Sequence, residues 1–268
     1  MSADSEAAGQ TADPGEAPAR QAVIAASRFD AVVFDMDGVV TQTATVHAAA
    51  WKALFDGYLR ERTERTGEPF KPFDVEADYL PYVDGKPRYD GVRDFLASRG
   101  VALPWGSPSD GPVAETVCGL GNRKNDFFLR EVAEHGVQAF PTTVALIHRL
   151  HEAGVETAVI SASKNTTAIL EAAGVSDLFA AQVDGTVAEQ RGLRGKPDPA
   201  VFVEAARELG VVSPRAIVVE DAEAGVEAGH KGGFGLVIGV DRAEHADALR
   251  RHGANVVVKD LADVTVAP

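Results

Sequence analysis

The chain has a single cysteine, Cys118, among its 268 residues. An intramolecular disulfide and a metal site built from several cysteines are therefore excluded. No apolar stretch approaches the roughly 20 residues that a membrane-spanning helix needs, and no internal repeat is visible. Basic side chains are also scarce, because 26 lysines and arginines stand against 40 aspartates and glutamates and give a net charge of −14. These absences favour a globular protein of a reducing compartment, which we expect to be the cytoplasm, with no binding to nucleic acid or membranes.

Residues 1–28 differ in composition from the rest of the chain. They are rich in Ala, Ser, Gly, Glu and Pro and lack hydrophobic periodicity. Their acidic start argues against a secretory signal. We therefore predict a disordered acidic tail over 1–28.

From Phe29 onward, short β-branched runs alternate with helical patterns, which is typical of a parallel sheet covered by helices on both faces. The predicted strands are Ala31–Phe34, Thr157–Ile160, Ala216–Val219, Leu236–Val240 and Asn255–Val258. Over a hundred residues separate the first two strands, far too many for one crossover connection. We therefore predict an α/β fold, with a Rossmann-like parallel sheet core over 29–43 and 139–268 and an inserted helical cap over 44–138.

Helical patterns fill the predicted cap. We expect its helices at Ala44–Arg60, Arg88–Ser98 and Val113–His135. Pro141 is suited to the first turn of a helix, so we expect it to open the helix that returns to the sheet.

Acidic or hydroxyl side chains follow three of the predicted strands at the point where each ends. Asp35 and Asp37 follow the first strand, Ser161 follows the second, and Glu220 and Asp221 follow the third. Ligands of an open parallel sheet bind outside the carboxyl ends of its strands, so we expect these side chains to meet. Crowded carboxylates favour bound Mg²⁺, or one carboxylate that keeps a proton. Taken singly, Asp35 and Asp37 could be solvated turn residues, and Ser161 and Asp221 could each be a helix cap.

Lys196 is the candidate cation of this site. It precedes Pro197 in the segment Gly195-Lys196-Pro197-Asp198-Pro199, and a proline at a helix start would hold the lysine beside the positive end of that helix. An ordinary surface lysine is the alternative.

In chain order, these residues resemble the four motifs of the haloacid dehalogenase-like phosphohydrolase superfamily. The motifs are Asp35-Met36-Asp37-Gly38, Ser161, Lys196 and Glu220-Asp221. The β-phosphoglucomutase subfamily is closer still, on the segments Thr43 to Trp51, including His47, and Ser161-Ala162-Ser163-Lys164-Asn165. In the cap, Gly85-Lys86-Pro87-Arg88 and Arg123-Lys124-Asn125-Asp126 are similar to its substrate-binding segments.

The resemblance implies a role for each core residue. Asp35 would be the nucleophile that becomes an aspartyl phosphate, and Asp37 would donate and accept the proton. Ser161 and backbone donors near Ala162 would hold the phosphoryl oxygens, while Lys196 would compensate their charge.

The resemblance also implies Mg²⁺ as the cofactor. Its ligands would be Asp35, Asp221 and the backbone carbonyl of Asp37, with Glu220 as a further ligand or a support behind the ligands.

The cap would close over the substrate and exclude water. Arg88, Lys124 and Asn165 would bind a second phosphate or the sugar, with solvated surface groups as the alternative reading. Thr43 and His47, just past the strand end, would serve as a hinge and as a hydrogen bond that responds to substrate, and Trp51 would also bind the substrate. A helix cap and an ordinary helix histidine are the alternatives for Thr43 and His47.

We therefore predict an enzyme that interconverts β-glucose 1-phosphate and glucose 6-phosphate through a glucose bisphosphate. A sugar-phosphate phosphatase and a non-catalytic sugar-phosphate-binding protein are the alternatives. The expected partner is a small phosphorylated sugar, and the expected state is a monomer, with a dimer left open.

Overall fold

A six-stranded parallel sheet forms the centre of the protein, in a computed structural model that describes residues 22–83, 86–242 and 244–268. The strand order is β4-β3-β2-β5-β6-β7. The strands are β2 (Ala31–Asp35), β3 (Glu156–Ile160), β4 (Ala181–Val183), β5 (Ala216–Glu220), β6 (Leu236–Val240) and β7 (Val256–Val258). All five residues of β2 are buried, as expected of the central strand of a sheet covered on both faces. The α/β class and the five predicted strands are confirmed; β4 was not predicted.

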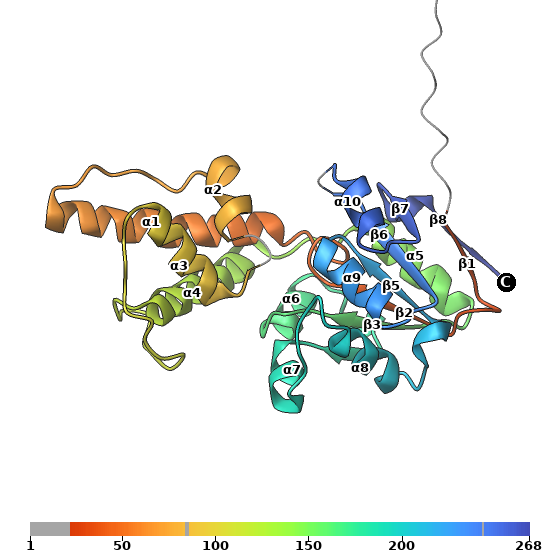
Figure 1. Cartoon of the computed structure of the whole chain (residues 1–268). Helices are drawn as coiled ribbons and strands as arrows, with labels where there is room; N and C mark the ends of the chain where they lie inside the picture. The colour runs from red at the N-terminus through yellow and green to blue at the C-terminus, as the bar shows by residue number, and fades with distance from the viewer. Residues whose placement is uncertain (1–21, 84–85, 243) are drawn as a thin grey trace, which may run out of the picture.

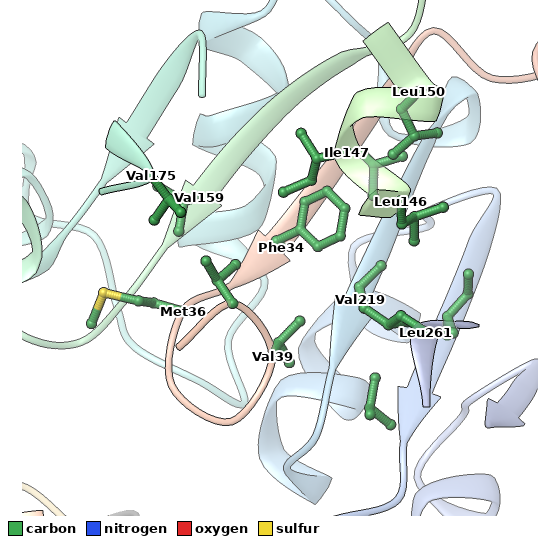
Figure 2. Close-up of a cluster of buried hydrophobic side chains, with 14 of the residues drawn as sticks. Phe34, Met36, Val39, Leu146, Ile147, Leu150, Val159, Val175, Val219 and Leu261 are labelled. Carbon is green, nitrogen blue, oxygen red and sulfur yellow. The ribbon is translucent and has the colours of Figure 1, made fainter. Parts of the chain in front are cut away.

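Helices cover both faces of this sheet (Figure 1). They are α5 (Pro141–Glu152), α6 (Thr166–Ala172), α7 (Gly185–Arg191), α8 (Ala200–Glu208), α9 (Glu223–Lys231) and α10 (Ala246–Arg251), with short 3-10 turns at Ser176–Leu178, Ser213–Arg215 and Leu261–Asp263. On one face, Phe34 of β2 packs among Leu146, Ile147 and Leu150 of α5 (Figure 2). On the other face, the apolar side of α8 with Phe202 packs against the sheet. Pro141 opens α5 as predicted.

Four helices form a separate lobe between β2 and β3 (Figure 1). They are α1 (Ala44–Thr66), α2 (Val75–Tyr82), α3 (Arg88–Ser98) and α4 (Val117–His135). The lobe has its own apolar core, in which the ring centroids of Phe55 and Phe95 lie 4.0 Å apart. The inserted cap and its three predicted helices are present.

The helix boundaries in the cap differ from the prediction at two places, and one helix was missed. α1 continues past Arg60 until Gly67, whose left-handed backbone ends it. α4 begins after Thr116, whose hydroxyl accepts from Gly119 N, so the predicted start at Val113 was four residues early. The short α2 was not predicted.

Two antiparallel linkers join the cap to the core. Gln42 N donates to Gln138 O at 2.8 Å, and Phe140 N donates to Val40 O at 2.9 Å. These linkers lie at the predicted domain boundaries. The two linkers are therefore held side by side by backbone hydrogen bonds where the cap meets the core.

The structure corrects the predicted end of the N-terminal tail. Ala22–Ala25 form β1, which pairs in parallel with β8 (Val264–Ala267) at the end of the core farthest from the cap (Figure 1). Ile24 and Val264 are fully buried there. The strand was missed because its partner lies more than 200 residues away in sequence, so no local pattern reveals it. The rest of the predicted tail, residues 1–21, lies outside the described residues.

Across the described ranges, no helix combines the length and the apolar character needed to cross a bilayer.

Candidate active site

Three carboxylates gather where β2 and β5 end. Asp35 is the last residue of β2, Glu220 is the last residue of β5, and Asp221 follows it. The parallel register sets Phe34 opposite Val219, which brings the next residues, Asp35 and Glu220, side by side. One oxygen from each of the three carboxylates lies within 4.8 Å of the others.

Burial concentrates negative charge in this group. Asp35 is 5% exposed and Glu220 is completely buried. Burial first, and then repulsion from Glu220 and from Asp35, raises the pKa of Asp221. Burial and the charge of Asp35 likewise raise the pKa of Glu220. Such a set of oxygens fits a hard divalent cation such as Mg²⁺, which would remove the repulsion.

Lys196 lies inside the acidic group. Its Nζ donates to Asp35 Oδ1 and, at 2.6 Å, to Glu220 Oε2. Burial by itself would lower the pKa of Lys196, but the charges of Asp35 and Glu220 outweigh it and raise that pKa. Lys196 is therefore a permanent cation beside the predicted nucleophile, and the surface-lysine reading is wrong.

Asp37 has a different environment from Asp35. Thr43 Oγ1 donates to Asp37 Oδ1, and Ser161 Oγ donates to Oδ2 at 3.2 Å. Burial and the charge of Asp35 raise the pKa of Asp37 to about 6. A carboxyl that titrates near neutrality can both donate and accept protons. The Asp37 side chain is not one of the three clustered carboxylates.

The side chain of Thr43 bonds a carboxylate of the site rather than its own helix. It occupies the position before the first turn of α1, but its hydroxyl does not cap the helix and bonds Asp37 instead. The helix-cap alternative for Thr43 therefore does not hold.

Gly38 makes the close packing of the catalytic loop possible. Its φ of 82° lies in the left-handed region, and a Cβ there would stand 1.8 Å from Asp221 Oδ2. Only glycine lets the loop after β2 pass so near the carboxylates.

On the cap side, Lys124 and His47 form a buried pair. Lys124 Nζ lies 2.7 Å from His47 Nδ1 and 5.0 Å from the ring centroid of Trp51. Burial, with help from the charge of Arg88, lowers the pKa of Lys124 to about 7, while Asp37 opposes the shift. Lys124 and His47 are thus not solvated surface groups.

Trp51 lies in the apolar core of the cap. It is 4% exposed and stacks on Phe55 with ring centroids 5.2 Å apart. The face of its ring lies near the Lys124 ammonium group. The predicted contact of Trp51 with substrate stays a prediction.

Arg88 and Asn165 meet through Asn125. Arg88 Nη1 donates to Asn125 Oδ1 at 2.7 Å, and Asn165 Nδ2 donates to the same oxygen at 2.8 Å. The structure therefore brings the predicted cap arginine to the predicted core amide. Ala162, whose neighbourhood was expected to supply backbone donors, lies exposed just beyond the end of β3.

Sequence reasoning missed one residue that contacts the catalytic loop. Arg242 Nε donates to Gly38 O at 3.0 Å, and its guanidinium lies 3.8 Å from the ring centroid of Phe140. Arg242 follows the end of β6, so the strand-end rule that found Asp35 and Ser161 could have found it too.

The fold and this acidic site are those of the haloacid dehalogenase-like hydrolase family. Residues 29–233 match the model of that family, and the chain belongs to it. The family resemblance seen in the motifs is thereby confirmed.

Named relatives refine this picture. A Mycobacterium bovis protein named beta-phosphoglucomutase is 49% identical over 237 residues, which cover 87% of this chain and 90% of that protein. A Mycobacterium leprae protein named trehalose-phosphate phosphatase is 40% identical over 129 residues, covering 47% of this chain and 28% of that protein. The crystal structure of a beta-phosphoglucomutase from Clostridium difficile superposes with a TM-score of 0.65 at 24% identity, covering 87% of this chain and 92% of that chain. This last similarity shows the fold.

Proposed function

We propose that the protein interconverts β-glucose 1-phosphate and glucose 6-phosphate through an aspartyl phosphate on Asp35 and a glucose bisphosphate. The observation that carries the proposal is the hydrogen bond between Asn125 of the cap and Asn165 of the core, with Arg88 on the same oxygen. A mutase must hold a second phosphate while the first is transferred, and these groups offer an arginine and an amide for it across the domain boundary. The M. bovis relative supports the same activity.

The core residues supply the transfer. Asp35 attacks the phosphorus atom, and Lys196, bonded to Asp35, compensates the charge of the transferring oxygens. Asp37 gives its proton to the departing sugar oxygen and later takes the proton of the attacking hydroxyl; its pKa of about 6 permits both. Thr43 and Ser161 orient the Asp37 carboxyl for this work.

Mg²⁺ is the cofactor that this donor set fits. Asp35, Asp221 and the backbone carbonyl of Asp37 would hold it, with Glu220 as a further ligand or support. When bound, it neutralises the phosphate and carboxylate charges and so lets the nucleophile approach.

A sugar-phosphate phosphatase is the second candidate. The M. leprae relative and the hydrolase family favour it, because water could replace the sugar hydroxyl at the same core. The complete set of Asp35, Asp37, Ser161, Lys196 and Asp221 argues against a binding protein without turnover.

We also propose that the protein works in the cytoplasm as a monomer. Its single cysteine, Cys118, is buried and unpaired, which suits a reducing compartment.

A product assay decides between the two activities. The protein is given β-glucose 1-phosphate, Mg²⁺ and a trace of glucose 1,6-bisphosphate, and glucose 6-phosphate and free phosphate are followed together. The mutase forms glucose 6-phosphate with little free phosphate. Release of free phosphate without glucose 6-phosphate would replace the mutase by the phosphatase.

A further inference from the structure

One amide oxygen joins the cap to the core. Asn125 Oδ1 accepts from Arg88 Nη1 at 2.7 Å and from Asn165 Nδ2 at 2.8 Å. Arg88 opens α3 and Asn125 lies on α4, both in the cap, whereas Asn165 lies just before α6 of the core. The two donors assigned above to the second phosphate are thus already engaged with the protein itself.

The donors around Asn125 Oδ1 are arranged as they would be around an oxygen of a bound oxyanion. A guanidinium N–H and an amide N–H converge on it at the distances that a phosphate oxygen would adopt. Arg88 Nε is buried and has no acceptor among the described residues. A buried donor is normally satisfied, so Arg88 offers an N–H that no described residue accepts. A phosphate group, with three terminal oxygens, could take both existing bonds and the unpaired one.

We propose that the Asn125 amide oxygen stands in for an oxygen of the substrate's second phosphate and must leave Arg88 and Asn165 before that phosphate binds. Asn125 is then a specificity-determining residue. Only a charged acceptor forms hydrogen bonds to Arg88 and Asn165 that are stronger than those of the amide oxygen, so only a charged acceptor gains binding free energy by displacing it. A neutral sugar hydroxyl exchanges one neutral acceptor for another and gains nothing. The inference rests on the proposed function for the nature of the ligand.

The test measures binding without turnover. Full-length protein carrying Asp35→Asn is titrated with glucose 1,6-bisphosphate in the presence of Mg²⁺ by calorimetry. Adding Asn125→Ala removes the internal acceptor, and the Kd should fall about three- to tenfold, the equivalent of one ordinary hydrogen bond. Adding Asn125→Asp should raise the Kd at least about tenfold, because a carboxylate pairs with Arg88 and repels phosphate.

Glu134→Ala is the control. Glu134 is exposed on the same helix as Asn125 but lies outside the segment that resembles a substrate-binding segment, so its loss should leave the Kd within about twofold. A higher Kd for Asn125→Ala would overturn the proposal, because Asn125 would then orient Arg88 in the bound state. No binding of the bisphosphate to the Asp35→Asn parent would overturn it as well. The proposed function is tested separately, by measuring glucose 6-phosphate and free phosphate formed by the unmodified protein.

Discussion

Asp35 and Asp37 are two residues apart, yet their surroundings give them different chemistry. Asp35 contacts a lysine and two carboxylates, whereas Asp37 is bonded by the hydroxyls of Thr43 and Ser161. These different neighbours suit the two roles that we propose, a nucleophile at Asp35 and a carboxyl that exchanges protons at Asp37.

Asp35→Asn should lower turnover by about a thousandfold or more, because the amide has nearly the same shape but is no longer an anionic nucleophile. The lysine that bonds Asp35 keeps Glu220 as a partner, so the fold should persist. Steady-state rates and circular dichroism check both points. Asp247→Asn, at a side chain that is 85% exposed, is the control. Most of the activity surviving in Asp35→Asn would refute the assignment.

The burial of Lys124 carries a stability cost. Its pKa falls from 10.5 in the unfolded chain to about 7 in the fold, so below pH 7 the protein must hold a buried charge. Stability tied to this group should therefore be low below about pH 7 and rise between that pH and 10.5.

Lys124→Met should remove that cost. At pH 6 we expect the free energy of unfolding to rise by about 1 kcal/mol, while activity on sugar phosphate falls. Thermal melts at pH 6 and pH 9 check the difference, which should shrink at the higher pH. Lys259→Met, at an exposed lysine, should change neither quantity. A destabilised Lys124→Met variant at pH 6 would contradict the reasoning.

At the scale of elements, the loop after β2 carries the catalytic geometry. Gly38 brings the loop against Asp221, and Arg242 binds the Gly38 carbonyl while covering Phe140 of the returning linker. Through Arg242, this loop is therefore connected to the linker that returns from the cap, while Gly38 lies against Asp221.

Gly38→Ala should disrupt this loop. The new Cβ would meet Asp221 Oδ2 at 1.8 Å, so one of the two must move, and we expect activity to fall at least about tenfold. Gly192→Ala is a matched control, since Gly192 also has a positive φ, of 66°, but open space around it. It should cost about 1 kcal/mol of stability and leave activity alone. Equal effects of the two substitutions on activity would contradict the steric account.

The pair of β1 and β8 makes a second prediction at this scale. Ile24→Ala should destabilise the protein by about 2–5 kcal/mol, because Ile24 is fully buried. Val23→Ala, one residue away on the same strand and 54% exposed, should change stability by less than about 0.5 kcal/mol. Denaturant titrations compare the two. Similar losses of unfolding free energy in the two variants would mean that burial of Ile24 in β1 does not stabilise the protein.

At the scale of the whole molecule, stability should depend on both pH and Mg²⁺. Glu220 and Asp221 have raised pKa values in the fold, so the folded state holds more protons than the unfolded state above about pH 4. Without metal, stability should therefore fall as pH rises from about 4 through neutrality.

Mg²⁺ should reverse this loss. At a concentration of 100 times its Kd it should add about 2.7 kcal/mol, and chelation should stop catalysis reversibly. Asp221→Asn should raise the melting temperature of the metal-free protein at pH 8 and abolish its response to Mg²⁺. An unchanged rate in metal-free protein would refute the mechanism.

The sequence by itself determined the parallel sheet, the inserted cap and the strand-end residues Asp35, Ser161 and Glu220. These follow from periodicity and from the rule that parallel strands share one carboxyl edge, both of which are local or fixed by topology. Only the tertiary structure decided the partners: Thr43 and Ser161 on Asp37, Lys196 between Asp35 and Glu220, and Asn125 between cap and core. The pairing of β1 with β8 belongs with these. Such contacts join residues far apart in sequence, and their chemistry depends on burial and distance, which a chain acquires when it folds.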